Sequence, residues 1–274
     1  MGDEVSYGLV GTAREGQGEE IIAELAGHPL GGGKDSTRLT GTTYLLADVR
    51  LLAPVLPSKV IGFGITGHAD AGGPDDGLDD GCVMYLKPST AVCGQADPIR
   101  YPAELTRRVE AEGELAVVIG RLCRQVPPSQ AAAVIFGYTC ATDVIARDLA
   151  DRDGQWARAT GFDTFCPLGP WIETGASVGD LALTMSVNGE VQQRGSSASP
   201  APALRARPRT GQLRRAVPEL VAYASSVMTL LPGDVLLTGP PAGSAQPAAV
   251  ELGDEVSVTI EGIGTLTNKV EKGD

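Results

Sequence analysis

Hydrophobic and polar positions alternate most clearly over residues 109–120, VEAEGELAVVIG. Residues 115–119 form an unbroken apolar run that ends at a glycine, which is typical of a buried strand. Acidic residues occupy every second position of the first half. Since side chains alternate between the faces of a strand, Glu110, Glu112 and Glu114 are predicted to project from one face. The segment is therefore predicted to be a central strand that carries a row of carboxylates.

Such a row of like charges needs neutralising partners. The neighbouring Arg107 and Arg108 could pair with it, and so could a cation. A second apolar segment, residues 133–144, carries Asp143, which is expected to bring another carboxylate to the row. Carboxylate oxygens suit a hard divalent ion. An acid pair on a strand is more often a solvated or salt-bridged face, and this alternative stays open on the pattern alone.

The remaining pattern predicts a β-rich α+β fold. Over the first fifty residues, short apolar runs alternate with glycine-rich turns, which indicates short strands and hairpins. We place a boundary near Leu56, which gives a small N-terminal β domain over residues 1–56 and a larger domain over residues 57–274. One amphipathic helix is predicted to begin at Pro218 and to end near Pro232.

Two segments have the composition of loops. Residues 72–81, GGPDDGLDDG, follow a buried strand predicted for residues 60–65 and combine glycine, proline and aspartate, which favours a mobile surface segment. Residues 195–215 are rich in serine, alanine, proline and arginine without an apolar period, which favours a flexible loop.

Composition and charge exclude several classes of partner. The chain has 274 residues, a mass of 28.3 kDa and 42% hydrophobic residues, enough for a sizeable core. A net charge of −12 argues against nucleic acid, because neutralising phosphates requires clustered lysine and arginine. No apolar stretch approaches the length of a membrane span, and the first residues lack the pattern of a signal peptide. We expect a cytoplasmic protein with a small-molecule partner and no membrane partner.

A set of motifs, taken in order, resembles the fumarylacetoacetate hydrolase superfamily over nearly the whole chain. The motifs are LLAPVLPSKVIGFG, VEAEGELAVVIGR, GYTCATDVIARDLA, ATGFDTFCPLGPW, VNGE, LLPGDVLLTGPPAG and GDEVSVTIEGIGTLTNKV. The resemblance implies a mixed β-sandwich roll with a small N-terminal β domain, generally found as a homodimer. It also implies that Glu112, Glu114 and Asp143 bind Mg²⁺ or Mn²⁺.

The same resemblance implies roles for residues around this site. The family has a histidine on a mobile lid as the base, for which His68 is the candidate, with Asp70 two residues later instead of the family's glutamate. Lys87 resembles the family's lysine at the mouth of the pocket, although it could simply be solvated. Arg147 is retained as a catalytic and substrate-binding residue.

The implied substrate is an enolisable β-dicarbonyl or 2-oxo acid that reacts through a metal-stabilised enolate, with hydrolysis of a C–C bond as the leading reaction. The alternatives are a non-hydrolytic step, such as isomerisation, decarboxylation, dehydration or cyclisation, and a metal-binding protein without activity.

Three substitutions depart from the family pattern. Thr160 replaces a lysine, Ala150 replaces a frequent glutamine, and Pro240 replaces a threonine that contacts the substrate. Thr160 and Pro240 therefore belong to the expected substrate pocket in altered form. The losses predict that the site lacks a nearby cation, and that a larger, less charged diketone is preferred over acylpyruvate or oxaloacetate.

Overall fold

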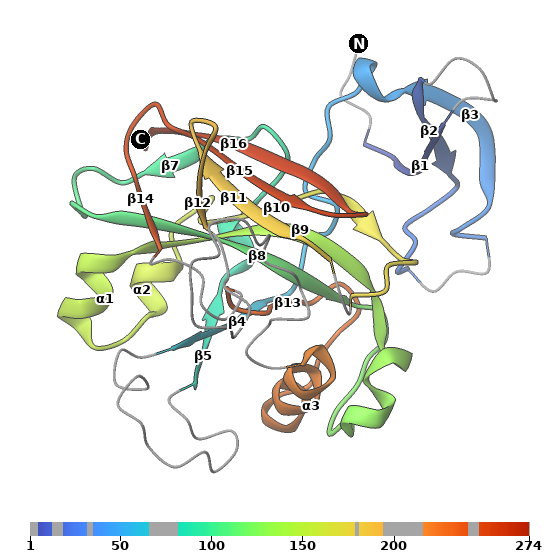
Figure 1. Ribbon diagram of the computed structural model, residues 1–274. Coiled ribbons are helices and arrows are strands. Elements are labelled where there is room, and N and C mark those ends of the chain that lie inside the picture. Colours follow the sequence, from blue (N-terminus) through green and yellow to red (C-terminus); the bar gives the residue numbers. More distant parts are fainter. Residues whose placement is uncertain are drawn as a thin grey trace, which may run out of the picture. The chain divides into compact units, whose positions relative to one another are not determined.

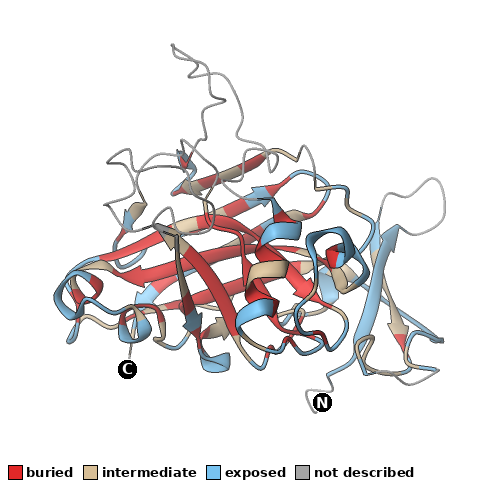
Figure 2. Cartoon of the chain, turned by 90° about the horizontal axis from the view of Figure 1, so that it is seen from below, coloured by how far each residue is buried: buried red, intermediate tan, exposed pale blue. Residues whose placement is uncertain are grey.

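The predicted acidic strand forms β8, Val109–Ile119, in the computed structural model of the protein. The structure describes residues 5–12, 19–31, 35–65, 82–178, 181–193, 216–240 and 247–273. β8 pairs antiparallel with β9, Ile135–Ala146, along its whole length. Both strands are buried over most of their length, and Figure 2 shows buried strands at the centre of the molecule. The apolar segment predicted over residues 133–144 is thus confirmed as the partner strand.

Two sheets are built around this pair. In spatial order, the first sheet contains β5 (Cys82–Lys87), β4 (Val60–Ile65), β13 (Val235–Leu237), β8, β9, β10 (Cys166–Glu173) and β6 (Val92–Cys93), and β14 (Ala248–Val250) also pairs with β8. The second sheet contains β12 (Glu190–Gln193), β11 (Leu183–Val187), β15 (Glu255–Ile260), β16 (Gly264–Lys272) and β7 (Ile99–Tyr101).

The two sheets pack face to face as a sandwich, as Figure 1 shows for β11, β15 and β16 over β8 and β9. On β8, the side chains of Leu115 and Val117 belong to the shared hydrophobic core, together with Met185 and Val258 of the second sheet. Alternation then directs the glutamates of β8 to the opposite face of the first sheet. The predicted β-rich α+β sandwich is confirmed.

Helices are few and short in the described residues. They are α1 (Arg147–Asp153), α2 (Ala157–Thr160), α3 (Val217–Val227) and the 3₁₀ turns η1 (Leu46–Asp48), η3 (Ser89–Ala91) and η4 (Pro128–Ala133). α3 is the predicted amphipathic helix, but its expected end near Pro232 is wrong. The helix ends at Val227 because Leu230 exchanges two backbone hydrogen bonds with Cys123. No helix among these is long and apolar enough to cross a membrane.

Contacts within the chain divide it into two units, Met1–Leu51 and Leu52–Asp274. The first unit is an antiparallel sheet of β1 (Tyr7–Thr12), β2 (Glu20–Leu25) and β3 (Leu39–Leu45), joined as two successive hairpins. The division lies a few residues before the boundary expected near Leu56.

A buried aspartate joins the strands at one side of β8. Asp234 accepts hydrogen bonds from Ser58 Oγ at 2.5 Å, from the backbone N–H of Leu231 at 2.7 Å and from the ammonium of Lys59. Its side chain is fully buried, whereas that of Lys59 is 20% exposed. These bonds hold the start of β13 beside β4, where Val235 pairs with Val60.

Asp234→Ala should therefore destabilise the protein by about 3 kcal/mol, or roughly 6 to 12 °C in Tm, since it leaves an ammonium and a backbone donor without their acceptor. Thermal unfolding measures this. The matched control is Glu271→Ala, which removes a half-exposed pair with Arg100 and should cost less than about 1 kcal/mol. Equal losses in the two variants would contradict the structural role of Asp234.

Candidate metal centre

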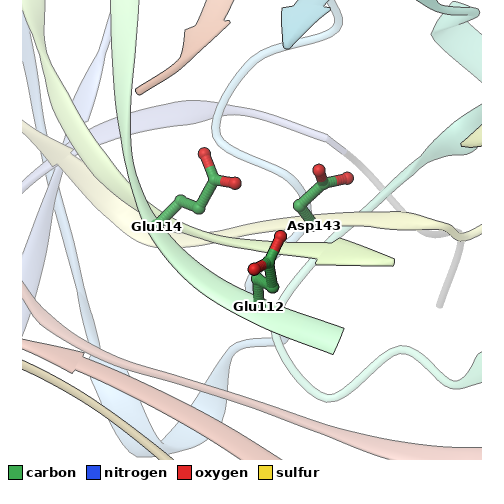
Figure 3. Close-up of side chains that lie close together, drawn as sticks. All are labelled: Glu112, Glu114 and Asp143. Carbon is green, nitrogen blue, oxygen red and sulfur yellow. The ribbon is translucent and has the colours of Figure 1, made fainter. Parts of the chain in front are cut away.

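The register of β8 and β9 brings three carboxylates together. Glu112 lies directly opposite Asp143, and Glu114 is two residues further along the same face of β8. One oxygen from each residue lies within 4.8 Å of the others, and Figure 3 shows the three side chains gathered on one side of the strand pair. Glu114 and Asp143 are buried. The structure thus brings together the three residues expected to bind a metal.

Glu110, the first acid of the row, has other partners. Its carboxylate pairs with Arg108 Nη2 at 2.5 Å and with Arg147 Nε at 2.8 Å. The Arg147 guanidinium also lies over the ring of Trp156, 5.9 Å from the ring centroid. Arginines therefore neutralise Glu110 at one end of the predicted row. Glu112 and Glu114, at the other end, lie close to Asp143.

Lys87 is fully buried beside the cluster. Its Nζ lies 2.6 Å from Asp143 Oδ1 and donates hydrogen bonds to the carbonyl oxygens of Val144, Thr160 and Phe165, at 2.8, 3.1 and 3.0 Å. The alternative of a solvated Lys87 is wrong. The expectation that the site lacks a nearby cation is also wrong, because β5 brings the Lys87 ammonium to Asp143 even though Thr160 replaces the family's lysine.

Tyr85 is a contact of the cluster that the sequence analysis missed. Its hydroxyl donates a hydrogen bond to Asp143, and its ring lies 5.1 Å from that of Trp156. Gly62 makes room for the ring, since a Cβ there would lie 2.1 Å from Tyr85 Cζ. A signal was present: Tyr85 stands two residues before Lys87, so the two side chains share one face of β5.

A backbone donor completes the surroundings of Glu114. The N–H of Gly239 donates to Glu114 Oε2 at 2.7 Å. Gly239 has φ of +76°, and a Cβ would lie 2.9 Å from the carbonyl oxygen of Phe63, so glycine suits this position on both grounds. The partly buried Pro240 follows it directly. Backbone groups of this kind carry no side-chain signature, so the sequence could not reveal the contact.

Burial raises the pKa of Glu114 well above its ordinary value, and repulsion from Asp143 and Glu112 raises it further. The Gly239 N–H and the Lys87 ammonium lower this pKa but do not offset the rise. The carboxylates are therefore held together against their repulsion. A divalent cation fits this set, because hard oxygen ligands are those that Mg²⁺ and Mn²⁺ prefer and its charge would relieve the repulsion.

The other expected site residues are placed as follows. His68 and Asp70, with the predicted lid, lie outside the described residues, as does the loop expected over residues 195–215. Thr160 is buried at the end of α2, and its Oγ1 donates to the carbonyl oxygen of Trp156 at 2.9 Å. Ala150 is buried in α1.

Comparisons with known proteins agree on one family. The family model described as "Fumarylacetoacetate (FAA) hydrolase C-terminal" matches residues 61–271, and the model described as "Rv2993c-like, N-terminal" matches residues 1–54.

Three similar proteins span most of the chain. Protein Rv2993c of Mycobacterium tuberculosis is 47% identical over 93% of this chain and 90% of its own length. Oxaloacetate tautomerase YisK of Bacillus subtilis is 33% identical over 86% of this chain and 78% of its own. A crystal structure described as 5-carboxymethyl-2-hydroxymuconate delta-isomerase from Mycobacterium smegmatis is 46% identical, with a TM-score of 0.80 over 98% of this chain and 96% of its own.

The raised pKa of Glu114 predicts how stability depends on pH without metal. The folded state holds the proton more tightly than the unfolded state, so this group's contribution is fully present below the unfolded pKa and is lost as pH rises through the folded pKa. Relative to Glu114→Gln, the free energy of unfolding of the wild type should fall by about 1.4 kcal/mol per pH unit between the unfolded-state and folded-state pKa values of Glu114. Urea unfolding in chelator from pH 4 upward measures the difference.

The control for this series is Glu104→Gln, because the side chain of Glu104 is 86% exposed. Its stability should follow the wild type across the pH range. If the difference in the free energy of unfolding between wild type and Glu114→Gln stayed constant across the pH range, this would contradict the inferred repulsion within the cluster.

Proposed function

The chain belongs to the fumarylacetoacetate hydrolase family, and we propose that it is a divalent-metal-dependent tautomerase that interconverts the keto and enol forms of a 2-oxo acid. The observation that carries the proposal is the cluster of Glu112, Glu114 and Asp143 on adjacent strands, in which Glu114 and Asp143 are buried and Glu112 is partly buried. Hydrolysis was the leading expectation from the sequence. Relatives named as a tautomerase and an isomerase favour the non-hydrolytic alternative instead.

The three carboxylates would hold Mg²⁺ or Mn²⁺. When bound, such an ion supplies positive charge that polarises the substrate's carbonyl group and stabilises the negative charge of its enolate form. Around the ligands, Tyr85 fixes Asp143 and the Gly239 N–H fixes Glu114. Each of these bonds limits the rotamers of a ligand before the substrate arrives.

Lys87 and Arg147 have different roles in this proposal. The hydrogen bonds of the Lys87 ammonium go to three carbonyl oxygens beside its ion pair with Asp143, so we assign it to holding the ligand set. Arg147 is 22% exposed, and its orientation is fixed by Glu110 and Trp156. It is the better candidate to bind the carboxylate of an anionic substrate. Pro240 and the segment around Thr160 would line the pocket without adding charge.

Tautomerisation moves one proton between the carbon next to the carbonyl group and the enol oxygen, and it consumes no water. The protein must therefore take up and return one proton but need not activate a water molecule, as hydrolysis requires. His68 remains the proposed base, with Asp70 close to it in sequence. The homodimer also remains a proposal, which light scattering would test.

Binding of Mn²⁺ tests the metal centre. Calorimetric titration should show about one site per chain, and Glu114→Gln or Asp143→Asn should weaken it by about a hundredfold or more, because each removes a charged ligand. The matched control is Glu110→Gln, on the same face of the same strand but paired with arginines. It should keep the wild-type affinity. An equal loss in Glu110→Gln, or unchanged binding in the other two variants, would contradict this assignment.

The reaction is tested with freshly dissolved enol-oxaloacetate. With Mn²⁺, the protein should accelerate the loss of enol absorbance with kcat/KM of about 10⁴ M⁻¹s⁻¹ or more, and chelation should remove this activity. Pyruvate formation, acetylpyruvate cleavage and a panel of bulky diketones are measured in parallel. Release of pyruvate as the main product would favour a decarboxylase or hydrolase. Preference for bulky diketones would restore the substrate expected from Thr160, Ala150 and Pro240.

A further inference from the structure

The pairing along one side of β8 is interrupted at the ligand residues. On that side, β14 pairs with residues 109–111 and β13 pairs with residues 116–118. Between them, the carbonyl oxygen of Leu115 accepts a hydrogen bond from the N–H of Thr238 at 3.1 Å. Among the described residues, no strand pairs with residues 112–114 on this side. The metal-binding segment therefore lies in a gap between two short strands.

The side chain of Gln193 fills this gap. Its Nε2 donates to the carbonyl oxygen of Gly113 at 2.7 Å, and its Oε1 accepts from the N–H of Gly113 at 2.7 Å. This reciprocal pair reproduces the exchange of a hydrogen-bonded residue pair in an antiparallel ladder. Gln193 comes from β12 of the other sheet and is only 4% exposed. The side-chain amide of Gln193 thus makes the two hydrogen bonds that a neighbouring strand would make with Gly113.

Gly113 allows the second sheet to come close enough for this contact. A Cβ on Gly113 would lie 2.9 Å from Met185 Cβ and 3.1 Å from Val258 Cγ2. The backbone between Glu112 and Glu114 is therefore packed by β11 and β15 on one face and held at its edge by Gln193. Any displacement of Gly113 must move both neighbouring carboxylates.

We propose that Gln193 is a positioning residue for the metal centre: by fixing Gly113 it sets the spacing of Glu112 and Glu114 for one divalent ion. The inference rests on the proposed metal-binding role of the cluster. Hydrogen bonds behind metal ligands commonly determine affinity, and losing one such partner typically weakens binding ten- to a hundredfold. Gln193 acts on the ligand strand from its backbone and from the opposite sheet, away from the ligand carboxylates.

The test is Gln193→Met, which keeps length and volume but loses both hydrogen bonds. It should weaken Mn²⁺ binding in calorimetry by about ten- to a hundredfold and alter the electron paramagnetic resonance spectrum of bound Mn²⁺. The matched control is Asn268→Leu. Asn268 lies in β16 of the second sheet, and its buried amide also donates to backbone carbonyl oxygens, those of Gly94 and Asp97. The control variant should lower Tm but leave the Mn²⁺ affinity and spectrum unchanged.

Gln193→Leu provides a second variant if the methionine variant does not fold. It also loses both hydrogen bonds to Gly113 without adding charge, so its Mn²⁺ affinity should fall as far as that of Gln193→Met. Wild-type affinity in the folded Gln193 variants, or an equal loss in Asn268→Leu, would overturn the positioning role alone. A wild-type protein that binds no Mn²⁺ would overturn the proposed metal function and this inference with it.

Discussion

The close approach of three carboxylates, two of them buried, is the constraint on which the rest of the site depends. The register that places Glu112 opposite Asp143 brings like charges together, and burial removes the water that would screen them. Burial, and then repulsion from Asp143 and Glu112, raise the pKa of Glu114. A divalent cation would relieve this repulsion, and this is the physical basis of the proposed metal centre.

The surrounding contacts act on the carboxylates from different parts of the chain. β5 supplies the Lys87 ammonium and the Tyr85 hydroxyl to Asp143. The segment that follows β13 supplies the Gly239 N–H to Glu114, and Gln193 of β12 holds Gly113 from the other sheet. At the far end of the row, arginines neutralise Glu110. One strand face is thereby divided into a salt-bridged part at Glu110 and a part suited to a metal at Glu112 and Glu114.

Local periodicity was enough to predict β8, its partner strand and the helix at Pro218, and it brought Asp143 near the row of glutamates. The selection of Glu112, Glu114 and Asp143 from that row rested on the family resemblance. Periodicity could not predict contacts that depend on which distant strands become neighbours. The burial of Lys87 could not be predicted, because it follows from the pairing of β4 with β5 and the packing of α2. Gly239 acts through its backbone, and Gln193 bonds to Gly113 at a point where no strand of the described residues pairs with β8, so neither has a periodic signal.

Anomalous diffraction from crystals soaked in Mn²⁺ would locate the ion among the side chains without reference to activity. One manganese peak is expected, with an oxygen of Glu112, Glu114 and Asp143 each at about 2.1 Å and the remaining positions open to water or substrate. A crystal that shows no peak at this cluster, or an ion held there by fewer than all three carboxylates, would contradict the proposed metal centre.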